Sequence, residues 1–198
     1  IPGPLKISVD MHKDARGWFF EAFNEERYAE HGIVGPWKQD NRSKSSRGMI
    51  RGLHLQHPKG QGKLVSTSQG QAFDVAVDVR VGSPTFAKWV CTVLDEHCDQ
   101  LWIPPGFAHG FVAMSDETIL NYKCSENGYS IEDEIVIRWD DPDIGLEWPS
   151  DWSLGIVDLG PTAPIETRMS EKDLNAPFLK DIMHKLPRYK EPKTSFKT

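Results

Sequence analysis

The sequence predicts an all-β domain in which antiparallel strands form a sandwich or a barrel. Short apolar segments alternate with turns for about 90 residues from residue 48 onward, and no clear helical pattern interrupts them. The most regular segment is 71–80, where Phe73, Val75, Val77 and Val79 alternate with smaller or polar residues. Evenly spaced strands with frequent turns and β-branched residues are typical of sandwiches and barrels.

The chain begins with an extended arm over residues 1–23. A turn over 13–17 separates its first strand from a short aromatic strand over 18–23. So much aromatic area near a chain end needs cover, either from the domain's own core or from a second subunit. A short helix is predicted from Asn24 to His31, because Asn24 can cap its first turn and Gly32 can end it.

The remaining elements follow in order. The polar segment 39–43 has the composition of a loop with Asx-type turns. Strands are predicted at 51–56, 63–68, 71–80, 86–94, 107–114 and 118–123, with 100–106 entering a tight bend before residue 107. Ser170 caps a helix that extends through Leu179 and covers one end of the barrel. We therefore expect a single domain over 1–184 and a basic, mobile tail over 185–198.

Composition excludes several classes of protein. The chain has 198 residues and a formal net charge of −6, which argues against a general nucleic-acid surface. No run approaches the roughly 18 apolar residues of a membrane span, and the first residues lack the pattern of a signal peptide. Cys91, Cys98 and Cys124 form no CxxC pair, so reduced thiols and a cytoplasmic location are expected.

The stretch from Arg51 to Lys63 holds the most informative polar residues. In an extended strand, Arg51 and Leu53 point to one face and His54 to the other, together with its polar neighbour two residues on. A turn over 58–62 follows, and Lys63 begins the next strand. His54 and Lys63 can therefore converge on a small ligand, although a surface hairpin with solvated charges would have the same pattern.

Two segments resemble the cupin type of jelly-roll barrel. Residues 104–109 match the Pro-x-Gly-x-x-His part of the second cupin motif, and the His54 turn stands at the position of the first. A metal-binding cupin would have a His-x-His pair there, followed by a carboxylate. This chain instead has His54 and His57 on opposite faces, followed by Lys63, and a cation opposes a divalent metal ion. We therefore expect no metal.

Many motifs in the right order give a more specific resemblance, over about residues 5–180. They are Asp14–Gly17, Gln39–Asn41, Arg51–His54, Gln61–Lys63, Phe73–Asp78, Ser83–Phe86, Leu101–Pro104, Gly106–Gly110, Tyr122–Cys124, Trp139–Pro142 and Ser170–Asp173. In these motifs the chain resembles the dTDP-4-dehydrorhamnose 3,5-epimerase family of nucleotide-sugar epimerases. The resemblance implies a cupin-type jelly roll with a few short helices, a homodimer with exchanged N-terminal arms, and no metal or organic cofactor.

The resemblance also implies a catalytic set for a dTDP-4-keto-6-deoxy sugar. Its keto group acidifies the C–H bonds at C3 and C5, so inversion needs a base, an acid across the ring and a cation at the enolate. By resemblance, His54 is the base, Asp173 is the carboxylate that orients it, Tyr122 is the acid and Lys63 is the cation. Such an enzyme takes part in dTDP-L-rhamnose-type deoxysugar biosynthesis and inverts C3, C5 or both.

Substrate-binding residues are implied in the same way. Arg51 suits the pyrophosphate, Tyr129 corresponds to the aromatic residue that stacks on thymine, and Arg16 and Glu21 reach the neighbouring subunit's site if the arm is exchanged. The full set is Arg16, Glu21, Gln39, Asp40, Asn41, Arg51, His109, Tyr129, Glu134 and Lys172.

Three departures from the family pattern bear on specificity. Arg42 replaces the usual histidine, residues 125–128 replace a more aromatic run, and the segment 150–168 is longer than expected. They leave open whether one or two centres are inverted and which nucleotide is bound. Two other classes, a metal-dependent cupin oxygenase and a non-catalytic sugar-nucleotide binding module, also remain as alternatives.

Overall fold

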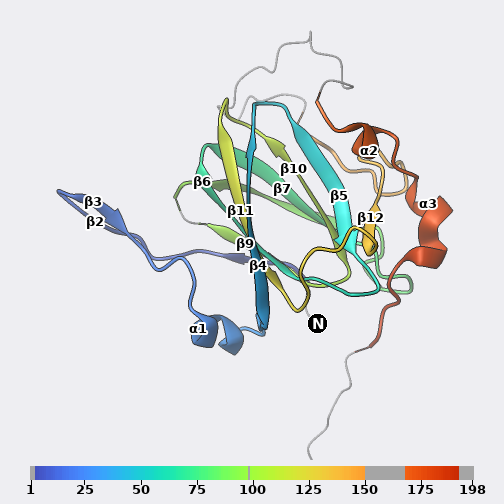
Figure 1. Ribbon diagram of the computed structural model, residues 1–198, viewed down its shortest axis with the longest axis horizontal. Coiled ribbons are helices and arrows are strands. Elements are labelled where there is room, and N and C mark those ends of the chain that lie inside the picture. Colours follow the sequence, from blue (N-terminus) through green and yellow to red (C-terminus); the bar gives the residue numbers. More distant parts are fainter. Residues whose placement is uncertain (1–2, 98, 150–167, 192–198) are drawn as a thin grey trace, which may run out of the picture.

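A computed structural model describes residues 3–97, 99–149 and 168–191. Two five-stranded antiparallel sheets face each other in a barrel (Figure 1). The first sheet has the strand order β1-β9-β6-β11-β4, and the second has the order β12-β5-β10-β7-β8. A two-stranded hairpin, β2-β3, lies outside both sheets. The predicted all-β, antiparallel class is confirmed.

The strands are short and the helices shorter. The strands are β1 (Leu5–Ile7), β2 (His12–Asp14), β3 (Gly17–Phe19), β4 (Trp37–Ser45), β5 (Ile50–Gln56), β6 (Lys63–Gln69), β7 (Gln71–Asp78), β8 (Trp89–Asp95), β9 (Gln100–Ile103), β10 (Phe107–Ala113), β11 (Thr118–Ser125) and β12 (Glu134–Val136). The helices are α1 (Glu25–Glu30), α2 (Glu171–Leu174), α3 (Leu179–Ile182) and the 3₁₀ helix η2 (Met183–Lys185). In the part of the chain that the structure describes, no helix is long and apolar enough to cross a membrane.

The alternation of β7 creates two apolar layers. Ala72 and Ala76 point between the two sheets, where they meet residues of the first sheet such as Val65. Val75 and Val77 point outward and pack under the C-terminal helices, against residues such as Leu179. The predicted alternation is therefore confirmed, and the helices cover the outer face of the second sheet rather than an end of the barrel.

Both predicted helix starts are confirmed by their capping bonds. The Asn24 side chain accepts a hydrogen bond from the Arg27 backbone N–H at the start of α1. Ser170 Oγ accepts one from the Asp173 N–H at the start of α2. These caps satisfy N–H groups that have no partner within the helix.

The prediction of a loop over 39–43 is wrong, because these residues belong to strand β4. The strand pairs with β11 from the Trp37–Ser125 pair to the Ser45–Thr118 pair. Its residues alternate between half-buried and exposed, but beyond Trp37 both faces are polar. Its inner face borders a polar cavity, so the apolar alternation that marks a strand is missing.

The N-terminal arm lies partly on its own barrel. Strand β1 pairs with β9, with Leu5 opposite Trp102. The hairpin of β2 and β3 extends away from the barrel (Figure 1), and its Trp18 and Phe19 are 60% and 69% exposed. Large exposed aromatic side chains on a projecting hairpin are typical of a surface that another chain covers.

The predicted tail begins too early. Leu186 is buried with α3 under the second sheet, Val81 forms a β-bridge with Arg188, and the Tyr189 N–H donates to the Val81 carbonyl at 3.0 Å. The chain is therefore docked on the barrel beyond residue 185, because Leu186 contributes an apolar side chain to the core. Residues 192–198 and most of the long segment 150–168 lie outside the described residues.

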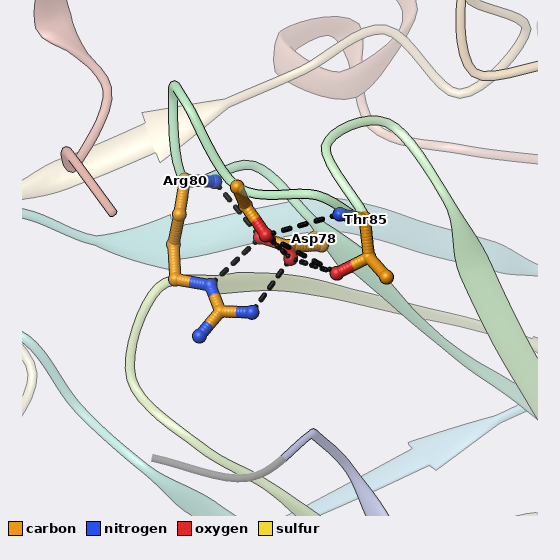
Figure 2. A network of polar contacts seen from close by, with 4 residues as sticks. Asp78, Arg80 and Thr85 are labelled. Carbon is orange, nitrogen blue, oxygen red and sulfur yellow. Dashed lines mark hydrogen bonds and ion pairs between the residues drawn. The ribbon is translucent and has the colours of Figure 1, made fainter. Parts of the chain in front are cut away.

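A buried carboxylate, Asp78, stabilises the connection between β7 and β8. Figure 2 shows Arg80 and Thr85 directed at Asp78, which is 1% exposed. Asp78 accepts from Arg80 Nε at 2.8 Å, from Arg80 Nη2 at 2.6 Å, and from the hydroxyls of Ser83 and Thr85 at 2.6 Å each. Burial alone would raise the pKa of Asp78, but these bonds outweigh it and lower the pKa. The network fixes the connection between β7 and β8.

Candidate active site

A polar cavity of about 250 Å³ lies inside the barrel, between the two sheets. Strands β4, β6 and β11 of the first sheet face β5 and β12 of the second across it. The lining residues are Gln39, Asn41, His54, Leu55, Gln56, Gln61, Lys63, Tyr122, Tyr129 and Glu134. The cavity therefore brings together three of the four predicted catalytic residues and four of the predicted binding residues.

His54 and Asp173 form a close pair beside this cavity. His54 Nε2 lies 2.7 Å from Asp173 Oδ1, although the residues are 119 positions apart. Burial alone would raise the pKa of Asp173, but contacts with His54, Ser170 and the Gly52 N–H together lower it. An ionised carboxylate only accepts hydrogen bonds, so Nε2 carries the proton. Nδ1 of His54 is then free to accept another.

Tyr122 and Lys63 come from adjacent strands of the first sheet. Tyr122 lies on β11 with Val65 opposite it on β6. Burial raises the pKa of the Tyr122 phenol, so it is protonated at neutral pH. Burial lowers the pKa of Lys63, against the opposing effect of Cys124, Asp74 and other acidic neighbours. The cavity thus holds an imidazole, a neutral phenol and an amine.

A second imidazole–carboxylate pair lies next to the first. His109 Nε2 is 2.9 and 3.0 Å from the two Asp74 oxygens, and Asp74 is fully buried. Burial lowers the pKa of His109, the Asp74 carboxylate opposes this shift, and Lys63 and His54 add to it. His109 on β10 is also the direct cross-strand partner of His54 on β5. The sequence predicted His109 but gave Asp74 no role, although its inward direction on β7 was the available signal.

Three residues at the opening of the cavity form a connected group. Lys172 Nζ lies 2.7 Å from Glu134 Oε2, and the Tyr129 hydroxyl donates to the same oxygen at 3.3 Å. Tyr129 is 51% exposed, so one side of its ring is accessible. All three belong to the predicted binding set, and the structure brings them together.

The structure does not bring every predicted binding residue to this cavity. Arg51 donates to Ser45 Oγ at 3.0 Å and has an exposed side chain. Asp40 is on the outer face of β4 and pairs with Lys123 at 2.7 Å. Arg16 pairs with Asp14 in the projecting hairpin, and Glu21 pairs with Arg27 of α1. In this chain, Asp40, Arg16 and Glu21 therefore lie away from the cavity lining.

Among residues 3–97, 99–149 and 168–191, no three or more His, Cys, Asp or Glu side chains are arranged to hold a metal ion. Cys91 and Cys124 are free thiols, and Cys98 lies outside the described residues.

Comparison with known proteins gives the family. The model of the dTDP-4-dehydrorhamnose 3,5-epimerase family matches residues 1–181. The chain belongs to this family. A curated relative, the dTDP-4-dehydrorhamnose 3,5-epimerase of Methanothermobacter thermautotrophicus, is 47% identical over 176 residues, covering 88% of this chain and 89% of the relative. The predicted family is therefore confirmed.

Solved structures of epimerases share the fold. The dTDP-6-deoxy-D-glucose-3,5-epimerase of Legionella pneumophila, in complex with dTDP-4-keto-L-rhamnose, has a TM-score of 0.84 at 41% identity, covering 95% of this chain and 94% of that chain. A 3′-monoepimerase from Streptomyces bikiniensis, in complex with dTDP-quinovose, has a TM-score of 0.81 at 34% identity, with coverages of 96% and 91%. These similarities confirm the predicted jelly-roll class of this epimerase-family chain.

The departures from the family pattern have different surroundings. Arg42 lies on the outer face of β4, where its Nε donates to Asn121 Oδ1 at 2.8 Å. It is therefore directed away from the cavity rather than toward a bound sugar. Residues 125–128, by contrast, lead directly into Tyr129 at the opening.

Proposed function

We propose that this chain is a cofactor-free epimerase that inverts C3 and C5 of dTDP-4-dehydro-6-deoxy-D-glucose. One observation carries the proposal: His54, oriented by Asp173, lines the same cavity as Tyr122 and Lys63, in a chain of this family. These are the base, acid and cation that epimerisation beside a ketone requires.

The reaction divides among these groups as follows. His54 Nδ1 removes the proton from the carbon beside the ketone, and Asp173 stabilises the imidazolium that forms. The electron pair moves onto the keto oxygen, where Lys63 stabilises the developing negative charge. Tyr122 then protonates the carbon from the opposite face and inverts it. Burial shifts the pKa values of both Lys63 and Tyr122, so charge interactions at these groups are stronger than in water.

The binding residues extend from the cavity to its opening. Arg51 binds the pyrophosphate through its planar guanidinium, and Tyr129 stacks on the base. Gln39, Asn41, His109, Glu134 and Lys172 contact the sugar nucleotide.

We also propose a homodimer in which each N-terminal hairpin docks on the partner. The exposed Trp18 and Phe19 support this arrangement, and it would bring Arg16 and Glu21 to the second chain's cavity. Asp40, on the outer face of β4, would then lie at or near the interface rather than on the sugar. A cytoplasmic location fits the free thiols.

A single-centre epimerase is the second candidate. It is supported by the 34% identity to a 3′-monoepimerase and by the unusual run at residues 125–128. The residue types of the cavity are those that either reaction needs.

The test is proton NMR of dTDP-4-dehydro-6-deoxy-D-glucose with the protein in D2O. We expect deuterium at both C3 and C5 and a product inverted at both carbons. Deuterium and inversion at C3 alone would identify the single-centre epimerase. Tight binding without deuterium at either carbon would show a binding module and overturn the proposal.

A further inference from the structure

The loop that carries Tyr129, residues 125–131, is attached to the barrel through side-chain amides. Gln56 Oε1 accepts a hydrogen bond from the Ser130 N–H at 2.9 Å. Gln61 Nε2 donates to the Asn127 carbonyl at 2.8 Å. Both glutamines are more than nine-tenths buried and line the cavity. The backbone on both sides of Tyr129 is thus fixed from inside the barrel.

The same loop is also joined to the turn before Lys63. Asn127 Nδ2 donates to the Gly60 carbonyl at 3.0 Å, and Gly62 and Ser125 exchange two bonds, at 2.9 and 3.2 Å. A Cβ at Gly62 would lie 2.2 Å from Trp102 and 2.6 Å from Ser125 Oγ, so only glycine permits this approach. The turn and the loop therefore form one unit.

This contact explains the residue types in the Gln61-Gly62-Lys63 motif. Gln61 reaches the loop, Gly62 lets the loop approach closely, and Lys63 faces the cavity. Tyr129 itself is half exposed, and its backbone N–H donates to Gln39 Oε1 at 2.8 Å. Packing restrains the half-exposed ring weakly, so its position depends on hydrogen bonds: those to the loop backbone and the one from its hydroxyl to Glu134.

We propose that Gln56 and Gln61 are positioning residues that hold Tyr129 at the cavity opening and so set the affinity for the nucleotide end of the substrate. The inference rests on the proposed function, because it takes Tyr129 as the ring on which the base stacks. The glutamines act on binding, whereas the proton transfers depend on His54 and Tyr122.

The first experiment measures dTDP affinity by calorimetry and the steady-state kinetics of epimerisation in Gln56→Leu and Gln61→Leu. Loss of one neutral hydrogen bond is expected to weaken dTDP binding about 5- to 10-fold and to raise KM similarly, with kcat unchanged. Gln69→Leu is the matched control, since Gln69 bonds Glu117 on the exposed surface. Equal dTDP affinity in all three variants and the wild type would overturn the inference.

A double-mutant cycle separates positioning from direct contact with the substrate. In a Tyr129→Ala background, Gln61→Leu should cause no further loss of dTDP affinity, because the ring it positions is gone. A loss as large as in the wild-type background would mean that Gln61 touches the nucleotide itself, and would overturn the inference.

A variant on the loop side, at a position less buried than the two glutamines, guards against misfolding of the buried variants. Asn127→Ala removes the bond to Gly60 from the loop side and is expected to weaken dTDP binding in the same way; unchanged affinity would count against the inference. If wild-type protein bound no dTDP, the proposed function would fail, and this inference with it. If the wild type binds dTDP and the variants match it, only the role of the glutamines fails.

Discussion

The contact between His54 and Asp173 makes a strong prediction for Asp173→Asn. The carboxylate lies 2.7 Å from Nε2 and can only accept a hydrogen bond, which leaves Nδ1 free as the base. An amide at the same place can donate to Nε2. That bond favours the tautomer with its proton on Nδ1, so the base is blocked. The substitution also removes the charge that stabilises the imidazolium.

The size of the effect follows from these two losses. A hydrogen bond to a charged group contributes about 1.5–3 kcal/mol, which is roughly 10- to 160-fold in rate. The wrong tautomer adds to this, and the same replacement in a serine-protease triad costs on the order of 10⁴-fold. Since Asp173 is only 3% exposed, water cannot easily take over the carboxylate's hydrogen bond to the imidazole. We therefore expect kcat to fall by about 10³-fold, between these bounds.

The assay is the initial rate of deuterium incorporation at saturating substrate, followed by proton NMR. Binding of dTDP should be unchanged, because Asp173 acts on the imidazole rather than on the nucleotide. Glu171→Gln, on the exposed side of the same helix, is the control and should keep the wild-type rate. A wild-type rate in Asp173→Asn would refute the role of the carboxylate in setting the tautomer.

Three further predictions concern charge. Asp78→Asn should reduce the free energy of unfolding by about 3 kcal/mol at neutral pH, because it leaves the largely buried Arg80 guanidinium without a counter-charge. Folding lowers the pKa of Asp78, so the stabilisation from its carboxylate is complete above its unfolded pKa of about 3.9 and is lost below it. The free energies of unfolding of the two proteins, measured by urea titration, should therefore converge as pH falls. A difference that stays constant with pH would contradict this. Lys63→Met should lower kcat by about 10²–10³-fold, as loss of an enolate-stabilising group does; a wild-type kcat would exclude that role. Arg16→Ala should weaken dTDP binding. A mixed dimer of one Arg16→Ala chain and one His54→Ala chain should regain one tight, active site, because one barrel then has an intact His54 and receives an intact arm. No recovery in the mixture would argue against exchanged arms.

The sequence allowed the fold to be predicted where local pattern and burial agree. Val75 and Val77 alternate with small residues because β7 separates two apolar layers, so the strand is visible in the sequence. The caps at Asn24 and Ser170 can also be predicted from the sequence. Each side chain accepts a hydrogen bond from a backbone N–H only three residues further along the chain. The turn between His54 and Lys63 can be predicted because the two residues flank a short, Gly-rich connection.

Other features depend on contacts that a linear pattern does not contain. Strand β4 has no apolar face, because Gln39 and Asn41 border a polar cavity. The partnership of Asp74 with His109 depends on the register between β7 and β10, which brings residues 35 positions apart together. The docking of the chain after residue 185 depends on a buried leucine at 186 and on backbone pairing of the following residues with Val81, within a basic segment.

The central claim is that His54 and Tyr122 act on opposite faces of one keto-sugar ring. The most direct measurement is proton NMR of the 4-keto sugar in D2O with His54→Ala and with Tyr122→Phe, reading deuterium content and configuration together. We expect no deuterium with His54→Ala, and deuterium with retained configuration with Tyr122→Phe. Unchanged deuterium uptake with His54→Ala, or full inversion with Tyr122→Phe, would contradict it.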